Sequence, residues 1–217
     1  MVKHLWTTLA ALLLLAACNQ SKKNNQSSAS AEPEVSTENP EPKSLEARIH
    51  ESSAAIASET FAAMSAVLMH KIQTEGADQA VVFCSERAWP ITDSLAQKHG
   101  VQISRKAVRY RNPANKATTE EAALLSIWEP MVKEHRKPEG KIVQRADGID
   151  WYGAIVIPHP RCLDCHGLLD KDDIFPETLA EINKRYPNDK AVNFELGDLR
   201  GMWKISYPAH YFDEKTN

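Results

Sequence analysis

Apolar side chains recur every three or four positions along residues 44–75 and 77–98, which is the period of α-helices with one buried face. On the first segment they are Ile49, Ile56, Ala63, Met64, Val67, Leu68 and Ile72. Gly76 ends the first segment and Gly100 follows the second, as expected after helices. Pro90 lies inside the second segment and is expected to kink or divide that helix, because proline lacks the N–H that a helix needs.

A shorter alternation, typical of strands, appears later in the chain. Residues 101–109 alternate enough to form a strand, and residues 201–207 predict another. Residues 141–146 and 151–157 flank Asp147-Gly148, a dipeptide typical of β-hairpin turns. Hairpin connections of this kind predict antiparallel pairing of the strands.

Two further helices are expected among these strands. Thr118 and Glu121 have the spacing of a capping box, so a helix is expected to start at Thr118 and to break near Pro130. Its inner positions are Leu124, Leu125, Trp128, Met131, Val132 and His135. Residues 176–186 predict a short helix. Two long helices, followed by strands mixed with short helices and without an internal repeat, predict an α+β domain with an antiparallel sheet.

The start of the chain has the pattern of an export signal. A positive beginning precedes the apolar residues 8–17, a run far shorter than the roughly 20 residues of a membrane-spanning helix. The run ends in Leu15-Ala16-Ala17-Cys18, which resembles a bacterial lipobox and predicts a signal peptide over residues 1–17 and a lipid on Cys18. An ordinary signal peptide with a chance cysteine is the alternative. Asn19 follows the cysteine, which by resemblance to lipoprotein sorting favours the periplasmic face of the outer membrane.

The segment that follows is polar. Residues 18–43 hold the lipidated cysteine and then almost no apolar side chain, so they cannot offset the entropy of ordering and are expected to form a disordered tether. Residues 44–217 are enough for one domain. The formal net charge is −3, so no basic excess argues for nucleic acid or for an anionic membrane surface as a partner. Membrane contact is expected through the lipid alone.

Cys162-Leu163-Asp164-Cys165-His166 has the attachment pattern of c-type haem. In that chemistry the two thiols form thioethers with one haem, and the histidine binds its iron. Three alternatives fit less well. A zinc site needs two more ligands, a thioredoxin-like pair does not need the histidine, and a disulfide across three residues closes a tiny loop and gains little stability.

The second axial ligand of such a haem is left open by spacing alone. Methionine and histidine are common in this position. The candidates by residue type are Met64, Met69, Met131, Met202, His70, His135, His159, His210 and Cys84. For most of them, a place in the core or on the solvated surface is the simpler interpretation.

With these motifs the chain resembles the Tll-like haem domain, a family found in exported c-type haem proteins and in the sensor regions of signalling proteins. The segments that carry the resemblance are Val82-Phe83-Cys84-Ser85 with Ala88 and Pro90; Arg105 with Arg109-Tyr110-Arg111-Asn112-Pro113-Ala114-Asn115; Cys162-Leu163-Asp164-Cys165-His166-Gly167; and Gly197-Asp198-Leu199-Arg200-Gly201. Together they span nearly the whole folded part. Lys106-Ala107 departs from the family, which tends to have small hydroxyl residues there.

The resemblance implies a PAS-like fold with long N-terminal helices on a small antiparallel sheet. It implies one covalent haem whose iron is held by His166 and by a cysteine that falls on Cys84. It also implies a role in redox or small-molecule sensing, in which the protein would act on a separate redox or signalling partner.

Three arginines share one parity along the predicted strand and its continuation. Arg105, Arg109 and Arg111 could therefore lie on one face, where haem propionates would find cationic partners. A solvated strand face is the alternative. Arg105 and Arg111 are the candidates we carry forward as cofactor-binding residues.

Three functions are compatible with a tethered haem. A redox or small-molecule sensor agrees with the resemblance and with a cysteine ligand, since a thiolate favours ferric iron. A periplasmic electron-transfer cytochrome c is the alternative, because haem, tether and export suit it equally. An enzyme such as a peroxidase would need an open sixth position and a distal acid or base, and a filled position argues against it.

Overall fold

The computed structural model describes residues 43–213. Within this range the elements are α1 (Leu45–Glu75), α2 (Ala77–His99), β1 (Gln102–Lys106), η1 (Pro113–Asn115), α3 (Thr119–Lys133), β2 (Lys141–Arg145), β3 (Gly148–Val156), η2 (Pro160–Cys162), α4 (Leu163–His166), η3 (Leu169–Lys171), α5 (Pro176–Arg185) and β4 (Leu199–Pro208). The predicted signal peptide, the lipid site at Cys18 and all but the last residue of the predicted tether lie outside the described residues.

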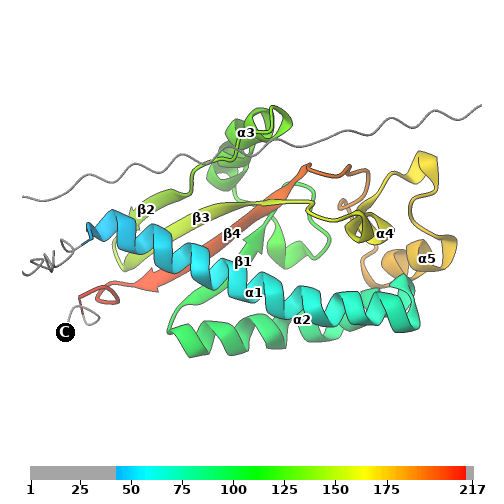
Figure 1. Ribbon diagram of the computed structural model, residues 1–217, viewed down its shortest axis with the longest axis horizontal. Coiled ribbons are helices and arrows are strands. Elements are labelled where there is room, and N and C mark those ends of the chain that lie inside the picture. Colours follow the sequence, from blue (N-terminus) through cyan, green and yellow to red (C-terminus); the bar gives the residue numbers. More distant parts are fainter. Residues whose placement is uncertain (1–42, 214–217) are drawn as a thin grey trace, which may run out of the picture. The chain divides into compact units, whose positions relative to one another are not determined.

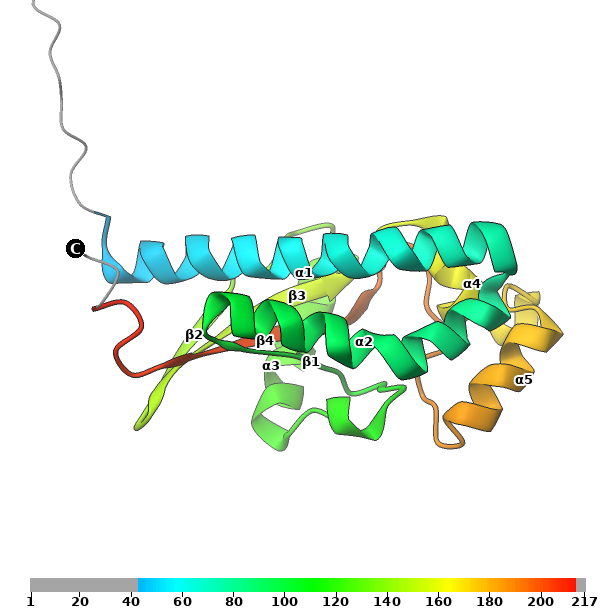
Figure 2. The ribbon, with the colours of Figure 1, turned by 90° about the horizontal axis from the view of Figure 1, so that it is seen from below.

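The two long helices are present as predicted. Ser44 caps α1 by accepting a hydrogen bond from the backbone N–H of Ala47. Gly76 has φ of +98°, a conformation that favours glycine, and it alone separates α1 from α2. The helices therefore pack side by side (Figure 2). Pro90 does not divide α2, which continues to His99.

The strands of the described residues form one four-stranded antiparallel sheet in the order β1-β4-β3-β2. This confirms the predicted α+β class. The hairpin between β2 and β3 turns at residues 146–147, because Arg145 pairs with Gly148. Gly148 is required there because a Cβ atom would collide with the carbonyl oxygen of Tyr207 on β4.

Helices cover both faces of the sheet. α1 and α2 bury Ile56 and Ala96 against one face, on which Trp203 and Ile205 of β4 lie. α3 packs Trp128 against the opposite face. Neighbouring residues of β3 and β4 alternate between the two clusters, as the period of a strand requires.

Two predicted boundaries are wrong for identifiable reasons. β1 ends at Lys106 and does not extend to 109, because Ala107 instead exchanges backbone hydrogen bonds with the 115–117 segment. The capping box at Thr118 is confirmed, but α3 passes Pro130 and ends only at Lys133. Proline so close to the end of a helix removes a single hydrogen bond, which the packing of α3 on the sheet offsets.

The remaining short elements gather beyond one end of the sheet. β3 leads into η2 and α4, and α5 packs beside α2 near the same end (Figure 1). The chain then returns from α5 to β4 through residues 186–198. This arrangement brings both halves of the chain to the end of the sheet at which the predicted haem motif lies.

Candidate cofactor site

A cavity lies between the long helices, the sheet end and the predicted attachment motif. Its volume is about 210 Å³, and it is open to solvent on one side. Its apolar walls are formed by Phe61, Met64, Leu68, Ile72, Ala80, Val81, Ile155, Ile157 and Trp203. An apolar lining with a few convergent polar groups is typical of a site for an organic ligand.

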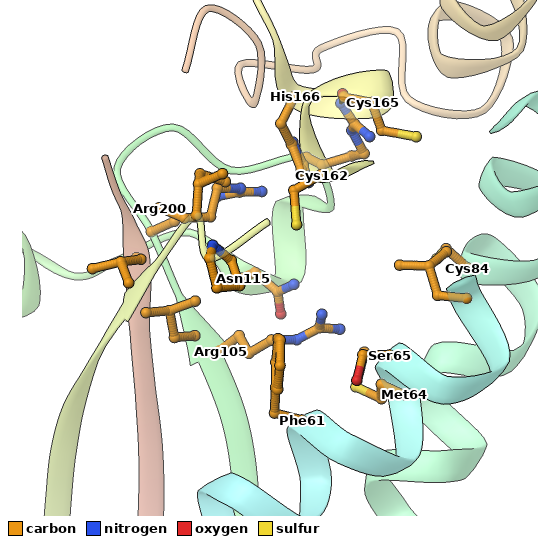
Figure 3. Close-up of a pocket in the computed structure, with 18 of the residues that line it drawn as sticks. Phe61, Met64, Ser65, Cys84, Arg105, Asn115, Cys162, Cys165, His166 and Arg200 are labelled. Atoms are coloured by element: carbon orange, nitrogen blue, oxygen red, sulfur yellow. The ribbon is translucent and has the colours of Figure 1, made fainter. Parts of the chain in front are cut away.

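All three residues of the predicted attachment motif line this cavity. Cys162 ends η2, and Cys165 and His166 lie on the single turn of α4 (Figure 3). The two cysteines are free and not joined in a disulfide. Within residues 43–213, no group of three or more His, Cys, Asp or Glu side chains is arranged to hold a metal ion by itself.

The imidazole of His166 is oriented by the backbone. Its Nδ1 lies 2.6 Å from the carbonyl oxygen of Ala191, and the nitrogen must donate because a carbonyl can only accept. Burial lowers the pKa of His166 well below its ordinary value, and the cations of Arg111 and Arg200 lower it further. The ring is therefore neutral, with its proton on Nδ1 and the lone pair of Nε2 available to a metal.

Cys84 lines the same cavity from α2 (Figure 3). Its thiol is free and half-buried. Burial raises the pKa of the Cys84 thiol, while the cations of Arg105 and Arg111 act in the opposite direction. The thiol is therefore protonated at neutral pH until a metal binds, because metal binding releases the proton of a cysteine ligand. Its role as a ligand stays a prediction.

The structure narrows the candidates for a second ligand. Of those named from the sequence, Met64 and Cys84 line the cavity within the described residues. The sulfur of Met64 lies 3.7 Å from the hydroxyl oxygen of Thr92 on α2, and that hydroxyl donates to the carbonyl oxygen of Ala88 at 2.9 Å. The candidates that do not line the cavity are Met69, Met131, Met202, His70, His135, His159 and His210.

Arg111 lines the cavity, but its guanidinium is already engaged by the protein. It donates to both carboxylate oxygens of Asp189, at 3.2 and 3.1 Å, and to the carbonyl oxygen of Cys165 at 2.6 Å. Its side chain and that of Asp189 are mostly buried. This geometry makes Arg111 an organiser of the attachment motif.

Arg105 and Arg200 enter the cavity from β1 and β4. Within the described part of the chain, the guanidinium of Arg105 forms no hydrogen bond or ion pair, and it points into the cavity (Figure 3). Arg200 donates to the carbonyl oxygen of Arg109 at 2.9 Å, but it has no carboxylate partner in residues 43–213. Burial lowers the pKa of both groups, and nearby cations help to lower that of Arg200 to about 9.

Arg109 does not line the cavity. Arg109 and Arg111 lie beyond the end of β1, so the expected common strand face does not form. The guanidinium of Arg109 stacks 3.5 Å above the centre of the Phe194 ring and donates to the carbonyl oxygen of Asn193 at 3.0 Å. It supports the segment behind His166, whose ring meets Phe194 edge-on.

Arg200 is the main site residue that the sequence did not single out. Ile155 pairs with Gly201 and Val156 pairs with Leu199, so Arg200 is the extra residue of a β-bulge. A bulge changes the direction of a side chain, and here it places Arg200 on the cavity wall. The Gly197–Gly201 motif contained this residue, but register shifts are not visible in an alternation pattern.

Other lining residues also come from unexpected elements. Asn115 belongs to η1, Tyr186 follows α5, and Phe61 and Ser65 lie on α1. No motif contains Phe61, Ser65 or Tyr186, and Asn115 belongs to a family segment that assigns it no role. The grouping of these residues depends on how distant parts of the chain pack.

Comparisons with known proteins agree with the motif resemblance. The family model described as Tll0287-like matches residues 41–208. A solved structure titled as that of the cyanobacterial heme-protein Tll0287 is 22% identical, with a TM-score of 0.55, and the match covers 76% of this chain and 97% of that chain. No curated protein matches the chain. The family match extends over most of the folded part, and the chain belongs to the Tll0287-like family.

Proposed function

We propose that the protein is a c-type haem protein with one haem, bound through Cys162 and Cys165, whose iron is held by His166 and Cys84. The observation that carries this proposal is that one cavity gathers both thiols of the attachment motif, a neutral imidazole and a third thiol from another element. The cyanobacterial relative with the same fold is described as a heme-protein.

The charges of the cavity support the same ligand. Among the described residues that line it there is no Asp or Glu, whereas Arg105 and Arg200 are cations without a carboxylate partner. A buried charge without a counterion is costly. The two propionates of a haem would neutralise these two guanidinium groups, and Arg–carboxylate pairs are strong hydrogen bonds.

The protein's own groups act on both residues that would hold the iron, His166 and Cys84. The Ala191 carbonyl fixes the tautomer of His166, so that Nε2 is ready to bind. Arg105 and Arg111 favour loss of the Cys84 proton, which burial alone would oppose. When bound, the haem supplies an iron that exchanges one electron and binds small ligands when an axial position is free.

We propose redox or small-molecule sensing as the role, with electron transfer as the alternative. Burial favours the protonated form of Cys84, so its surroundings oppose the thiolate that would bind the iron. Such a ligand is suited to leaving when the iron is reduced, which is useful in a sensor. An electron carrier keeps both ligands in both oxidation states, because a change of ligand slows electron exchange.

The covalent bond is tested by acid–acetone extraction of the denatured protein. In the wild type the haem is expected to stay with the polypeptide and to stain for haem peroxidase activity on a denaturing gel. The matched control is the double variant Cys162→Ser, Cys165→Ser, from which the haem should pass into the organic phase. Extraction of the haem from the wild type would contradict the proposal.

We also propose that the protein is a lipoprotein on the periplasmic face of a bacterial membrane, with Asn19 favouring the outer membrane. The support is the lipobox-like Leu15-Ala16-Ala17-Cys18 and the presence of a haem motif that is filled outside the cytoplasm. Wild type should partition into detergent, whereas Cys18→Ala should not be matured to the lipid-bearing form. Equal behaviour of both in detergent partition would contradict the lipid anchor.

A further inference from the structure

β3 has an open edge within the described residues. β2 pairs with β3 only from Gly148 to Tyr152, whereas β4 pairs with it as far as Val156. β3 thus continues past β2 toward α4 with no strand beside it on that side (Figure 1). Alternate residues from 153 to 156 direct backbone N–H and C=O groups to this edge, and no backbone hydrogen bond joins them to the 135–140 segment. The edge can therefore pair with a further strand.

The open edge lies in a groove. One wall is a face of α1, formed by His50, Ala54, Ala57, Ser58 and Phe61. The other wall is the 135–140 segment, which joins α3 to β2. Because α1 and α3 pack on opposite faces of the sheet, a strand added at the edge would meet α1 with one face and the 135–140 segment with the other. A groove beside a free strand edge is the geometry in which proteins accept an extended peptide.

The floor of the groove is held in place by Trp151. Its side chain is buried, and its indole N–H donates to Nδ1 of His50 at 3.1 Å. The ring lies so close to the backbone that a Cβ atom would come within 2.5 Å of it at Gly140 and within 2.1 Å at Gly153. No side chain therefore projects over the edge at these two positions. A floor that is fixed before docking lowers the entropy cost of binding.

The wall formed by α1 is apolar. None of its five lining residues is Asp, Glu, Lys or Arg. Phe61 on this wall is 43% exposed, and Val156 at the end of β3 is 38% exposed. A docked strand would remove both side chains from water if its side chains on this face were apolar, which favours binding.

The opposite wall is basic. Residues 133–141 contain four Lys or Arg and two Glu side chains, which gives this segment a net charge of +2, whereas the whole chain carries −3. Lys137 lines the groove, is exposed, and forms no hydrogen bond or ion pair within residues 43–213. Acidic side chains on the second face of a docked strand would complement this wall.

We propose that the groove binds an extended segment of a separate protein, with alternating apolar and acidic side chains, as a strand beside residues 153–156. The alternation follows from the period of a strand, because successive side chains point to the apolar wall and to the basic wall in turn. Four residues of β3 offer about 13 Å of edge for this pairing.

The open edge favours a peptide over other occupants. A row of backbone N–H and C=O groups is satisfied by another backbone, whereas lipid chains offer no hydrogen-bonding partner. In a second copy of this chain, residues 153–156 would be recessed between the same two walls. Two recessed edges cannot approach each other, so a free extended segment fits the groove better.

Docking would bring the partner to the wall of the cofactor cavity. The side chains that line both the groove and the cavity are Phe61, Ile155, Val156, Pro158 and Trp203. A strand in the groove therefore contacts a wall whose other side faces the cavity. The pairing itself uses no haem, so its test is separate from that of the proposed function.

Fluorescence anisotropy with synthetic peptides tests the proposal on the full chain. A fluorescein-labelled peptide of three Glu-Val repeats should bind at least about tenfold more tightly than one of three Lys-Val repeats. Two further Glu-Val peptides carry N-methyl groups on alternate residues, one on each parity. Only one parity pairs with β3, so one of the two peptides should lose about tenfold or more in affinity while the other keeps most of it.

Charge reversal in the basic wall tests the place of binding. Lys137→Glu should weaken binding of the Glu-Val peptide by about tenfold. Lys184→Glu is the matched control, because it changes the net charge equally on α5, which contributes no residue to the groove, and its side chain is 72% exposed. It should change the affinity by no more than about twofold. Equal thermal unfolding midpoints would show that both variants are folded.

Three results would overturn the inference. The Glu-Val peptide could fail to bind, or both N-methylated peptides could bind equally well, which would exclude strand pairing. Lys137→Glu and Lys184→Glu could weaken binding equally, which would assign it to net charge alone. The protein could also be a dimer that binds peptide only after dilution into monomers, which would assign the groove to a second copy.

Discussion

Arg111 Nη2 donates a hydrogen bond of 2.6 Å to the carbonyl oxygen of Cys165, while the same guanidinium pairs with Asp189. The contact joins the loop after β1 to the turn that carries the attachment motif and to the segment after α5. Nη2 also lies 3.3 Å from the carbonyl oxygen of Ala191, whose other contact orients His166. Arg111 thus holds in place both the backbone of Cys165 and the carbonyl group of Ala191 that orients the imidazole of His166.

Arg111→Gln should therefore lower the stability of the protein. The side chains of Arg111 and Asp189 are only 14% and 6% exposed, and removal of one member of a buried pair leaves the other charge without a partner. The expected loss in the free energy of unfolding is about 3–5 kcal/mol. Chemical denaturation followed by circular dichroism measures it.

Arg136→Gln is the control for this substitution. Arg136 pairs with Glu134, but their side chains are 58% and 62% exposed, so the expected change is within about 1 kcal/mol. Equal losses for the two variants would show that burial of the Arg111 pair is not what matters.

The neutral state of His166 predicts a dependence of stability on pH in the haem-free protein. The folded chain keeps this imidazole neutral far below its ordinary pKa of 6.5, whereas the unfolded chain takes up a proton there. Unfolding then binds a proton, so stability is lost as the pH falls below about 6.5, by at most about 1.4 kcal/mol per pH unit. Denaturation of the Cys162→Ser, Cys165→Ser variant, freed of any haem that it still binds non-covalently, between about pH 7 and 5 measures the slope.

Two further substitutions in that haem-free background identify the group. His166→Gln should reduce the slope, because the group that titrates differently in the two states is gone. His210→Gln should not, since the side chain of His210 is 81% exposed. Slopes that are the same in all three proteins would contradict the assignment to His166.

The sequence was informative where chemistry or capping is local. The attachment motif occupies five consecutive residues, so its spacing alone brings Cys162, Cys165 and His166 to one turn. The capping box at Thr118 likewise sets the start of α3 through bonds between neighbours. The break expected near Pro130 does not form, because the packing of a helix on a sheet outweighs one missing hydrogen bond.

The rest of the site depends on pairing between distant segments. Arg200 reaches the cavity through a bulge that exists only because β3 and β4 shift register. Arg111 was expected on a strand face, but β1 stops at Lys106, and the partner that engages Arg111, Asp189, comes from a loop far along the chain. An alternation pattern contains no information about either event.

The unpaired cations predict a shift in the reduction potential of a bound haem. Reduction adds negative charge, which nearby cations stabilise, so Arg105→Gln or Arg200→Gln should each lower the potential. With an effective dielectric constant of about 20 and a separation of about 10 Å, the shift is on the order of 70 mV per charge. Potentiometric titration of the haem absorption bands measures it.

Arg161→Gln provides the control for charge at the mouth of the cavity. Arg161 also lines the cavity, but its side chain is 61% exposed and pairs with Asp164, so solvent screens its effect. A much smaller shift is expected. Shifts of the same size in all three variants would show that the potential responds to net charge and not to cations placed inside the cavity.

The assignment of Cys84 as second ligand predicts a specific spectroscopic change. A thiolate bound to low-spin ferric iron has its own optical and electron paramagnetic resonance signals, which Cys84→Ser should abolish. Loss of the strong donor should raise the reduction potential. Met64→Leu is the matched control, because Met64 is the other candidate ligand that lines the cavity, and it should leave the ferric spectrum unchanged.

If Cys84→Ser keeps the wild-type ferric spectrum while Met64→Leu changes it, the thioether of Met64 is the ligand. Electron transfer would then become the better proposal, because a methionine ligand need not leave on reduction. If Cys84 is the ligand and its thiolate takes up a proton on reduction, ferrous wild type should bind carbon monoxide readily, as expected of a sensor.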